Sequence, residues 1–351
     1  ARVLFSHMKA INVTPDPYTI TLLMGLENTS EGITSLWNDI VDTTEVLMTP
    51  TIYHSIISAY GKANDAASAC CVFSHMVASV DLSNSLNSWN VLLSALSKAS
   101  GQNPRAVIDC NASSAFGLHF DGDQSELQTL YGKEFHEIVD ELTPPEAAKA
   151  IIDLMNKAKD DKEISRRVLR PNSQSYCLVA SCLSQAEGTG HEDALKLYND
   201  AVENGLPADG RMLNAIIRCY GDNIELAVDA WKAVYRPAAA VATRDDPASP
   251  SGVSRKRVKN LVAAYHGLLH VAGKAYRPDI ALRVVYAMAK EGVDPTEASL
   301  NAYNSGARNR TQDKEKVRLH GQYESLLTVE CTKYDKHDKR RSSEKRVRII
   351  I

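Results

Sequence analysis

Few residues in this sequence have the types and spacing that catalysis or metal binding requires. The carboxylates of Asp121 and Asp123, on either side of Gly122, are of the kind that begins a calcium-binding loop. In such a loop the sixth position is a glycine and the twelfth a glutamate, whereas here these positions hold Glu126 and Gly132. The sequence has no glycine-rich phosphate-binding motif, no dinucleotide-binding motif and no paired Cys or His metal motif. We therefore expect no bound metal, no cofactor and no enzymatic activity.

The composition is that of a globular protein. The 351 residues are 44% hydrophobic and 24% charged, which excludes a wholly disordered chain, a collagen and a multi-span membrane protein. The longest mostly apolar stretch, residues 261–273, is shorter than the roughly 20 residues that cross a bilayer, so no membrane insertion is expected. Seven cysteines, an odd number without regular paired spacing, favour a reducing compartment.

Charge is unevenly distributed, although the net charge is only −3. Residues 101–143 contain eight acidic and two basic residues, whereas residues 333–348 contain eight basic and three acidic residues. A second basic run lies at residues 255–259. These two basic runs are the candidate phosphate-binding patches, and the alternative is that they are a solvated helix start and a flexible tail.

Two apolar patterns recur along the chain. In the first, an Ala is followed four residues later by a large residue and seven later by an apolar one, so that all three lie on one helical stripe. This pattern begins at Ala1, Ala69, Ala148, Ala194, Ala227 and Ala281. In the second, a leading residue, large and apolar, precedes aliphatic residues three and four positions later. The leading residues are Ile20, Tyr53, Trp89, Tyr176, Leu213, Tyr265 and Leu300, and four of the six intervals between them are close to 35 residues.

These patterns predict a helix–turn–helix repeat of about 35 residues. Because such a unit cannot bury its apolar face alone, we expect the repeats to stack into an all-α, right-handed α-solenoid, and a non-repetitive helical bundle is the alternative. We expect repeats at residues 1–100, 144–236 and 255–306, and a charged C-terminal extension at 307–351. The repeats are interrupted by an acidic insertion at 101–143 and by a Pro/Ser-rich insertion at 237–254. We expect both insertions to be flexible or ordered by a partner.

The repeats resemble those of the pentatricopeptide repeat family. The resemblance is carried by the repeat endings at residues 13–16, 169–172, 205–209 and 292–295, by the helix openings at Ser88-Trp89-Asn90 and Ser175-Tyr176, and by residues 1–8 and 281–293. It covers about residues 1–306, except for the two insertions. The related tetratricopeptide repeat has its own Trp-Leu-Gly-Tyr signature, which is absent from this sequence.

The resemblance implies an RNA-binding protein that acts in RNA processing, stability or translation in a mitochondrion or chloroplast. It implies single-stranded RNA as the partner, with one base per repeat read by a residue of the first helix and a residue of the turn between repeats. The first-helix positions are Thr21, His54, Asn90, Cys177, Asn214, His266 and Asn301. The turn positions are Asp16, Thr49, Ser85, Asn172, Asp209 and Thr296, and the candidate phosphate contacts are Lys62, Lys98 and Lys274. We expect the targeting segment of an organellar protein to be absent from the sequence given.

A second function remains open, that of a non-catalytic scaffold or accessory subunit of an organellar ribosome or another large assembly. Its protein partners would bind through the solenoid and the acidic insertion. Outside residues 101–143 and 333–348 the chain is close to neutral, which is less basic than a strong RNA binder usually is. Only Asn90 with Asn172 forms a polar pair of the type the family uses for base reading.

Overall fold

The computed structural model is built from helices throughout the residues that it describes. These are residues 2–11, 13–42, 48–78, 85–113, 135–158, 169–185, 190–206, 209–236, 255–291, 293 and 295–307. The predicted all-α fold is confirmed. A bilayer-spanning helix is not found among the described helices, each of which is too short or too polar for that role.

The chain divides into two compact units, residues 1–186 and 187–351. The helices of the first unit are α1 (Arg2–Ala10), α2 (Pro17–Leu26), α3 (Ser30–Val41), α4 (Pro50–Lys62), α5 (Ala66–Ala78), α6 (Leu86–Gln102), α7 (Phe135–Val139), α8 (Pro144–Lys157) and α9 (Ser173–Leu183). Those of the second unit are α10 (Gly190–Glu203), α11 (Gly210–Arg218), α12 (Ile224–Ala230), which continues as the π-helix η3 (Trp231–Tyr235), α14 (Arg255–Lys274), α15 (Pro278–Lys290) and α16 (Glu297–Ala307).

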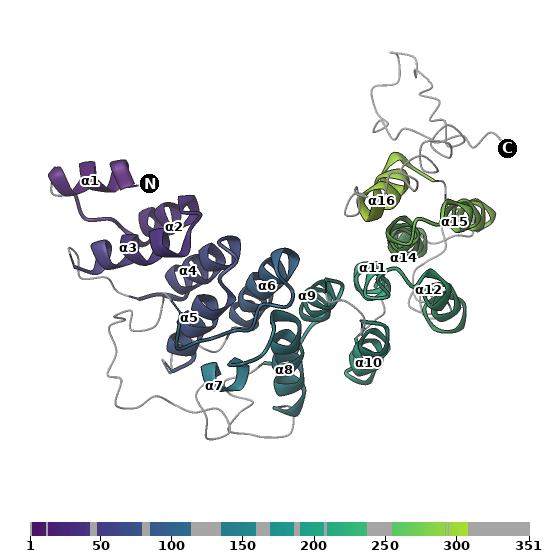
Figure 1. Cartoon of the computed structure of the whole chain (residues 1–351), viewed down its shortest axis with the longest axis horizontal. Helices are drawn as coiled ribbons and strands as arrows, with labels where there is room; N and C mark the ends of the chain where they lie inside the picture. The colour runs from purple at the N-terminus through teal and green to yellow at the C-terminus, as the bar shows by residue number, and fades with distance from the viewer. Residues whose placement is uncertain are drawn as a thin grey trace, which may run out of the picture. The chain divides into compact units, whose positions relative to one another are not determined.

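Within each unit the helices form the predicted helix–turn–helix repeats. The first helices of consecutive repeats lie side by side, as α2, α4, α6 and α9 in the first unit and as α11, α14 and α16 in the second (Figure 1). The second helices α5, α8 and α15 pack against the first helices of their own repeats, α4, α6 and α14. An all-α helical repeat fold is therefore confirmed, and the handedness of the solenoid stays a prediction.

The leading residues form the core between the two helix layers. Tyr53, Trp89, Tyr176 and Tyr265 are all at most 3% exposed. Most residues of the apolar stripes of the second helices, such as Phe73 of α5, are buried in the same core. Both sequence patterns thus identify the buried faces of the two helices.

The acidic insertion is partly built into the first unit. Ile108, Cys110, Phe135 and Val139 are buried, and the Ile108 N–H donates to the Leu142 carbonyl oxygen at 2.8 Å. The prediction of a flexible insertion is therefore wrong for residues 103–113 and 135–143, because their apolar side chains join the repeat core. Residues 114–134, the Pro/Ser-rich insertion at 237–254 and the C-terminal extension from 308 lie outside the described residues.

Close approach of neighbouring first helices depends on small residues. A Cβ atom at Gly61 of α4 would lie 2.6 Å from both Cα and Cβ of Ala95 of α6, which is inside any allowed contact. Gly25 of α2, by contrast, has no such neighbour within 4 Å. Gly61 therefore sets the spacing of α4 and α6, and Gly25 is a matched helical glycine without that role.

We predict that Gly61→Ala destabilises the first unit by about 1–3 kcal/mol, because the added methyl group forces α4 and α6 apart. Gly25→Ala should leave stability unchanged or raise it by about 0.5–1 kcal/mol, the usual gain for Ala over Gly in a helix. Urea unfolding followed by circular dichroism measures both. Equal unfolding midpoints for the two variants would contradict the packing described.

Candidate nucleic-acid interface

The predicted base-reading positions all lie on first helices. Thr21, His54, Asn90 and Cys177 belong to α2, α4, α6 and α9 in the first unit, and Asn214, His266 and Asn301 belong to α11, α14 and α16 in the second. Thr21, His54, Cys177, Asn214 and His266 are half-buried, Asn301 is exposed and Asn90 is buried. Because consecutive first helices are neighbours, these positions form a row within each unit.

Three of the seven side chains are held by a hydrogen bond to the next repeat. His54 Nε2 lies 2.8 Å from Ser88 Oγ, and His266 Nε2 lies 3.0 Å from Ser299 Oγ. The Ser175 hydroxyl donates to Asn90 Oδ1 at 2.7 Å. In each case the partner is a buried serine that directly precedes the leading residue of the next first helix. These side chains therefore join neighbouring repeats.

The polar pair Asn90 and Asn172 is brought together in space by Ser175. Asn172 Oδ1 accepts a hydrogen bond from the Ser175 N–H at 3.0 Å, and the Asn172 N–H donates back to Ser175 Oγ at 3.2 Å. Since Ser175 Oγ also bonds Asn90, which is only 4% exposed, the pair is linked through one hydroxyl group. A base could reach Asn90 only after this link opens.

Five of the six predicted turn positions serve as N-caps of the first helices. Thr49 Oγ1 accepts from the Ile52 N–H at 3.4 Å, Ser85 Oγ from the Asn87 N–H at 3.2 Å and Asp209 Oδ1 from the Met212 N–H at 2.8 Å. The same holds for Asp16 and Asn172, and Thr296 directly precedes α16. Their side chains thus satisfy helix N–H groups that have no partner within the helix.

Two cations lie close together at the C-terminal ends of α4 and α6. Lys62 and Lys98 are both exposed, and Lys62 Nζ is 3.4 Å from the carbonyl oxygen of Gly25 in α2. Partial burial and, to a lesser degree, the positive charge of Lys62 lower the pKa of Lys98. Neighbouring lysines at helix C-termini form a positively charged patch suited to phosphate groups.

The second unit has a corresponding group of basic residues. Arg218 at the end of α11 lies near His270 and Lys274 of α14. Burial and the charges of Arg218 and Lys274 lower the pKa of His270 to about 4, so its ring is neutral at pH 7. His270 Nδ1 lies 3.0 Å from Ser305 Oγ of α16, another contact between first helices.

From the sequence, these serines and Arg218 were assigned no role in the site. The serines could have been recognised by their position, because three of the leading residues are each directly preceded by a serine, namely Ser88, Ser175 and Ser299. Arg218 stands five positions after a leading residue, as His270 does, so repeat alignment could have placed both on the same face.

Three other candidate sites lie wholly, or in their side chains, outside the described residues. The Asp121–Asp123 segment and the basic run at residues 333–348 lie outside the described residues. For residues 255–259 only the backbone, the first turns of α14, is described. Within the described part of the chain, no group of three His, Cys, Asp or Glu side chains could hold a metal ion.

Comparison with known proteins identifies the repeat. The family model described as PPR repeat matches residues 51–79, which are α4 and α5 with the turn between them. The predicted resemblance to the pentatricopeptide repeat family is thereby confirmed. No curated protein matches the sequence.

Solved structures that are similar to this chain include those of the pentatricopeptide repeat protein PPR10. One is the crystal structure of PPR10 in complex with an 18-nt psaJ RNA element. Its chain is 14% identical to this one, the TM-score is 0.33, and the match covers 91% of this chain and 42% of PPR10. For PPR10 from maize the identity is also 14%, the TM-score is 0.29 and the coverage is 94% and 46%. The chain therefore spans less than half the length of these structures.

We predict that Ser175→Ala destabilises the first unit by about 1–3 kcal/mol, because it leaves the buried Asn90 amide oxygen without its partner. Ser94→Ala on α6, a half-buried serine of the same unit, is the matched control and should cost little. Urea unfolding of both variants measures the difference. A Ser175→Ala variant as stable as Ser94→Ala would show that the bond between repeats is not formed.

The unfolding free energy of the second unit should fall as the pH is lowered from 7 towards 4. The folded state disfavours protonation of His270, whereas the unfolded chain protonates it near pH 6.5, so acid favours unfolding across this window. His270→Gln should reduce this pH dependence. Thermal melting at several pH values provides the measurement, and equal pH profiles for wild type and His270→Gln would contradict the account.

Proposed function

We propose that this pentatricopeptide repeat chain binds single-stranded RNA along the first helices of its repeats, without catalysing a reaction. The observation that carries the proposal is the position of Lys62 and Lys98. Lys62 ends the first helix of the repeat that the family model matches, and Lys98 stands at the equivalent position of the next repeat. An RNA strand running across consecutive first helices would meet one cation per repeat at this point.

Affinity in this proposal comes mainly from phosphate contacts. The side chains of His54, Asn90 and His266 already bond the next repeat, so their capacity to read base edges is reduced. Asn301 is exposed and is therefore more accessible for hydrogen bonds to bases. We therefore infer that the chain binds RNA with a modest sequence preference instead of a continuous base-by-base code.

The site of action that we propose is a mitochondrion or chloroplast, with a role in RNA processing, stability or translation. This part rests on the resemblance to the family. The described cysteines support it to the extent that all are free thiols, as expected in a reducing compartment.

The second candidate is a scaffold or accessory subunit of an organellar ribosome or another large assembly. It is favoured by the exposed carboxylates of the acidic insertion, among them Asp109, Glu137 and Glu141, which lie on the folded part of that segment. Carboxylates repel RNA phosphates, so this surface is suited to a protein partner.

We predict that Lys62→Gln with Lys98→Gln weakens binding of random single-stranded RNA. For each phosphate that a lysine no longer neutralises, the slope of log Kd against the logarithm of the salt concentration should fall by about 0.7. The matched control is Lys157→Gln, an exposed lysine at the end of the second helix α8. Filter binding between about 50 and 200 mM salt measures both quantities.

Two results would overturn this function. One is wild-type chain that shows no RNA binding at the lower salt concentration. The other is a Lys62→Gln, Lys98→Gln variant that binds as the Lys157→Gln control does.

A further inference from the structure

In the first unit, a third aromatic ring covers the contact between a second helix and the following first helix. Phe73 of α5 and Trp89 of α6 lie with ring centroids 4.8 Å apart. Phe135 of α7 contacts both, at 4.9 Å from Phe73 and 5.7 Å from Trp89. The short helix α7 lies between the second helices α5 and α8 and contacts each of them (Figure 1). Phe135 thus fills the space between two consecutive second helices.

The second unit contains the equivalent aromatic pair. Trp231 of η3 and Tyr265 of α14 occupy the sequence positions of Phe73 and Trp89, and their centroids are 4.9 Å apart. Among the described rings, none other contacts this pair. The place that α7 holds in the first unit corresponds here to an open groove of about 640 Å³. The groove lies between η3 with α12 on one side and α15 on the other, over α14, and its lining is mainly apolar, with Val228, Leu268, Val284 and Ala287 beside the two rings.

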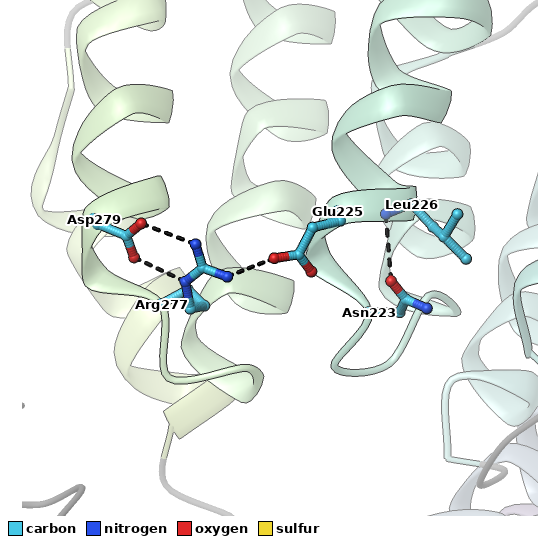
Figure 2. Close-up of polar contacts among 5 residues, drawn as sticks. All are labelled: Asn223, Glu225, Leu226, Arg277 and Asp279. Atoms are coloured by element: carbon cyan, nitrogen blue, oxygen red, sulfur yellow. Dashed lines mark hydrogen bonds and ion pairs between the residues drawn. The ribbon is translucent and has the colours of Figure 1, made fainter.

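An ion pair links the two second helices at each end of this groove. At the N-terminal ends, Arg277 bonds Glu225 of α12 and Asp279 of α15, with Arg277 Nε 3.0 Å from Asp279 Oδ1 (Figure 2). Asn223 caps the same end of α12 by accepting a hydrogen bond from the Leu226 N–H at 3.3 Å. At the opposite end, Arg236 Nη2 lies 2.6 Å from Glu291 Oε1. The groove is therefore bounded at both ends by an ion pair.

The rim of the groove is positively charged. Lys232, Arg283 and Lys290 are exposed at its edge, and none of them forms an ion pair with a described residue. Asp229 is the one exposed carboxylate of the lining outside the two end pairs. The helix that fills the equivalent space in the first unit is acidic, with Glu137 in α7 and Asp140 and Glu141 directly after it. The apolar lining of the groove is thus suited to the aromatic ring of such a helix, and the basic rim is suited to its acidic residues.

We propose that this groove binds a short acidic helix of a partner protein, which inserts an aromatic side chain between α12 and α15, beside the buried pair Trp231 and Tyr265, at the place that corresponds to that of Phe135 in the first unit. Burial of one aromatic ring supplies the anchor, and Lys232, Arg283 and Lys290 attract the acidic flanks and set the orientation. The site uses second helices, whereas the proposed RNA contacts use first helices, so the two functions are tested separately.

The probe is a fluorescently labelled peptide with the sequence of residues 133–143, KEFHEIVDELT, which carries the chemistry expected of the partner. Its binding to the full chain is followed by fluorescence anisotropy. We expect saturable binding that weakens about tenfold or more when alanine replaces the peptide's phenylalanine, since a buried aromatic anchor contributes most of the affinity in such a contact.

Matched variants of the chain locate the binding site. Ala287→Phe places a ring in the groove and should abolish binding, whereas Ala289→Phe, at an exposed position of the same helix outside the groove lining, should not. Lys232→Glu with Arg283→Glu should weaken binding about tenfold, and Lys196→Glu with Arg211→Glu, which changes the charge equally elsewhere in the unit, should have little effect. Circular dichroism and thermal melting of each variant show that it is folded.

Three outcomes would overturn the proposal. The first is the absence of peptide binding to the wild-type chain. The second is binding that the Ala287→Phe and Ala289→Phe variants retain equally. The third is binding only after residues 240–251 are deleted, which would show that the chain's own segment occupies the groove. The RNA-binding experiment with Lys62→Gln and Lys98→Gln is independent of these three outcomes, so the groove proposal and the RNA-binding proposal can fail separately.

Discussion

The side-by-side contact of consecutive first helices is the interaction on which the rest of the structure depends. Two features produce this contact. Small residues such as Gly61 allow the helix backbones to approach each other. Hydrogen bonds then join a polar side chain of one first helix to a buried serine of the next. A repeat of two helices cannot bury its apolar face alone, so each repeat is stable only when this contact forms. The polar bonds also fix the register, because a buried serine or amide without its partner is costly.

This constraint changes how the candidate RNA interface is understood. A residue type that could read a base can also hold the next repeat, and at His54, Asn90 and His266 the structure uses it for the second purpose. The residues that remain available for RNA are the cations at the ends of the first helices and the exposed polar residues between them. Affinity would then be set by charge along the row more than by base identity.

Much of the fold could be predicted from the sequence, because the repeats bury the same positions each time. The leading residues and the apolar stripes gave the helix pairs, their order and their buried faces correctly. The sequence did not reveal that α7 belongs to the core, since five residues with one aromatic anchor have no helical period to detect. The candidate base-reading residues lie on first helices, as predicted, but the sequence did not show that three of them are bonded to serines, because such a bond depends on the distance between two helices. The groove over Trp231 and Tyr265 was equally hidden, since it results from a ring that the first unit has and the described part of the second lacks.

The central claim is that polar side chains at predicted base-reading positions, namely His54, Asn90 and His266, form hydrogen bonds to the next repeat. A double-mutant cycle on Asn90 and Ser175 tests this claim most directly. The unfolding free energies of wild type, Asn90→Ala, Ser175→Ala and the double variant give the interaction energy of the two side chains. We predict a favourable coupling of about 1 kcal/mol or more, as expected for residues in direct hydrogen-bonded contact. Additive effects of the two substitutions would contradict the claim and return Asn90 to the set of side chains available for RNA.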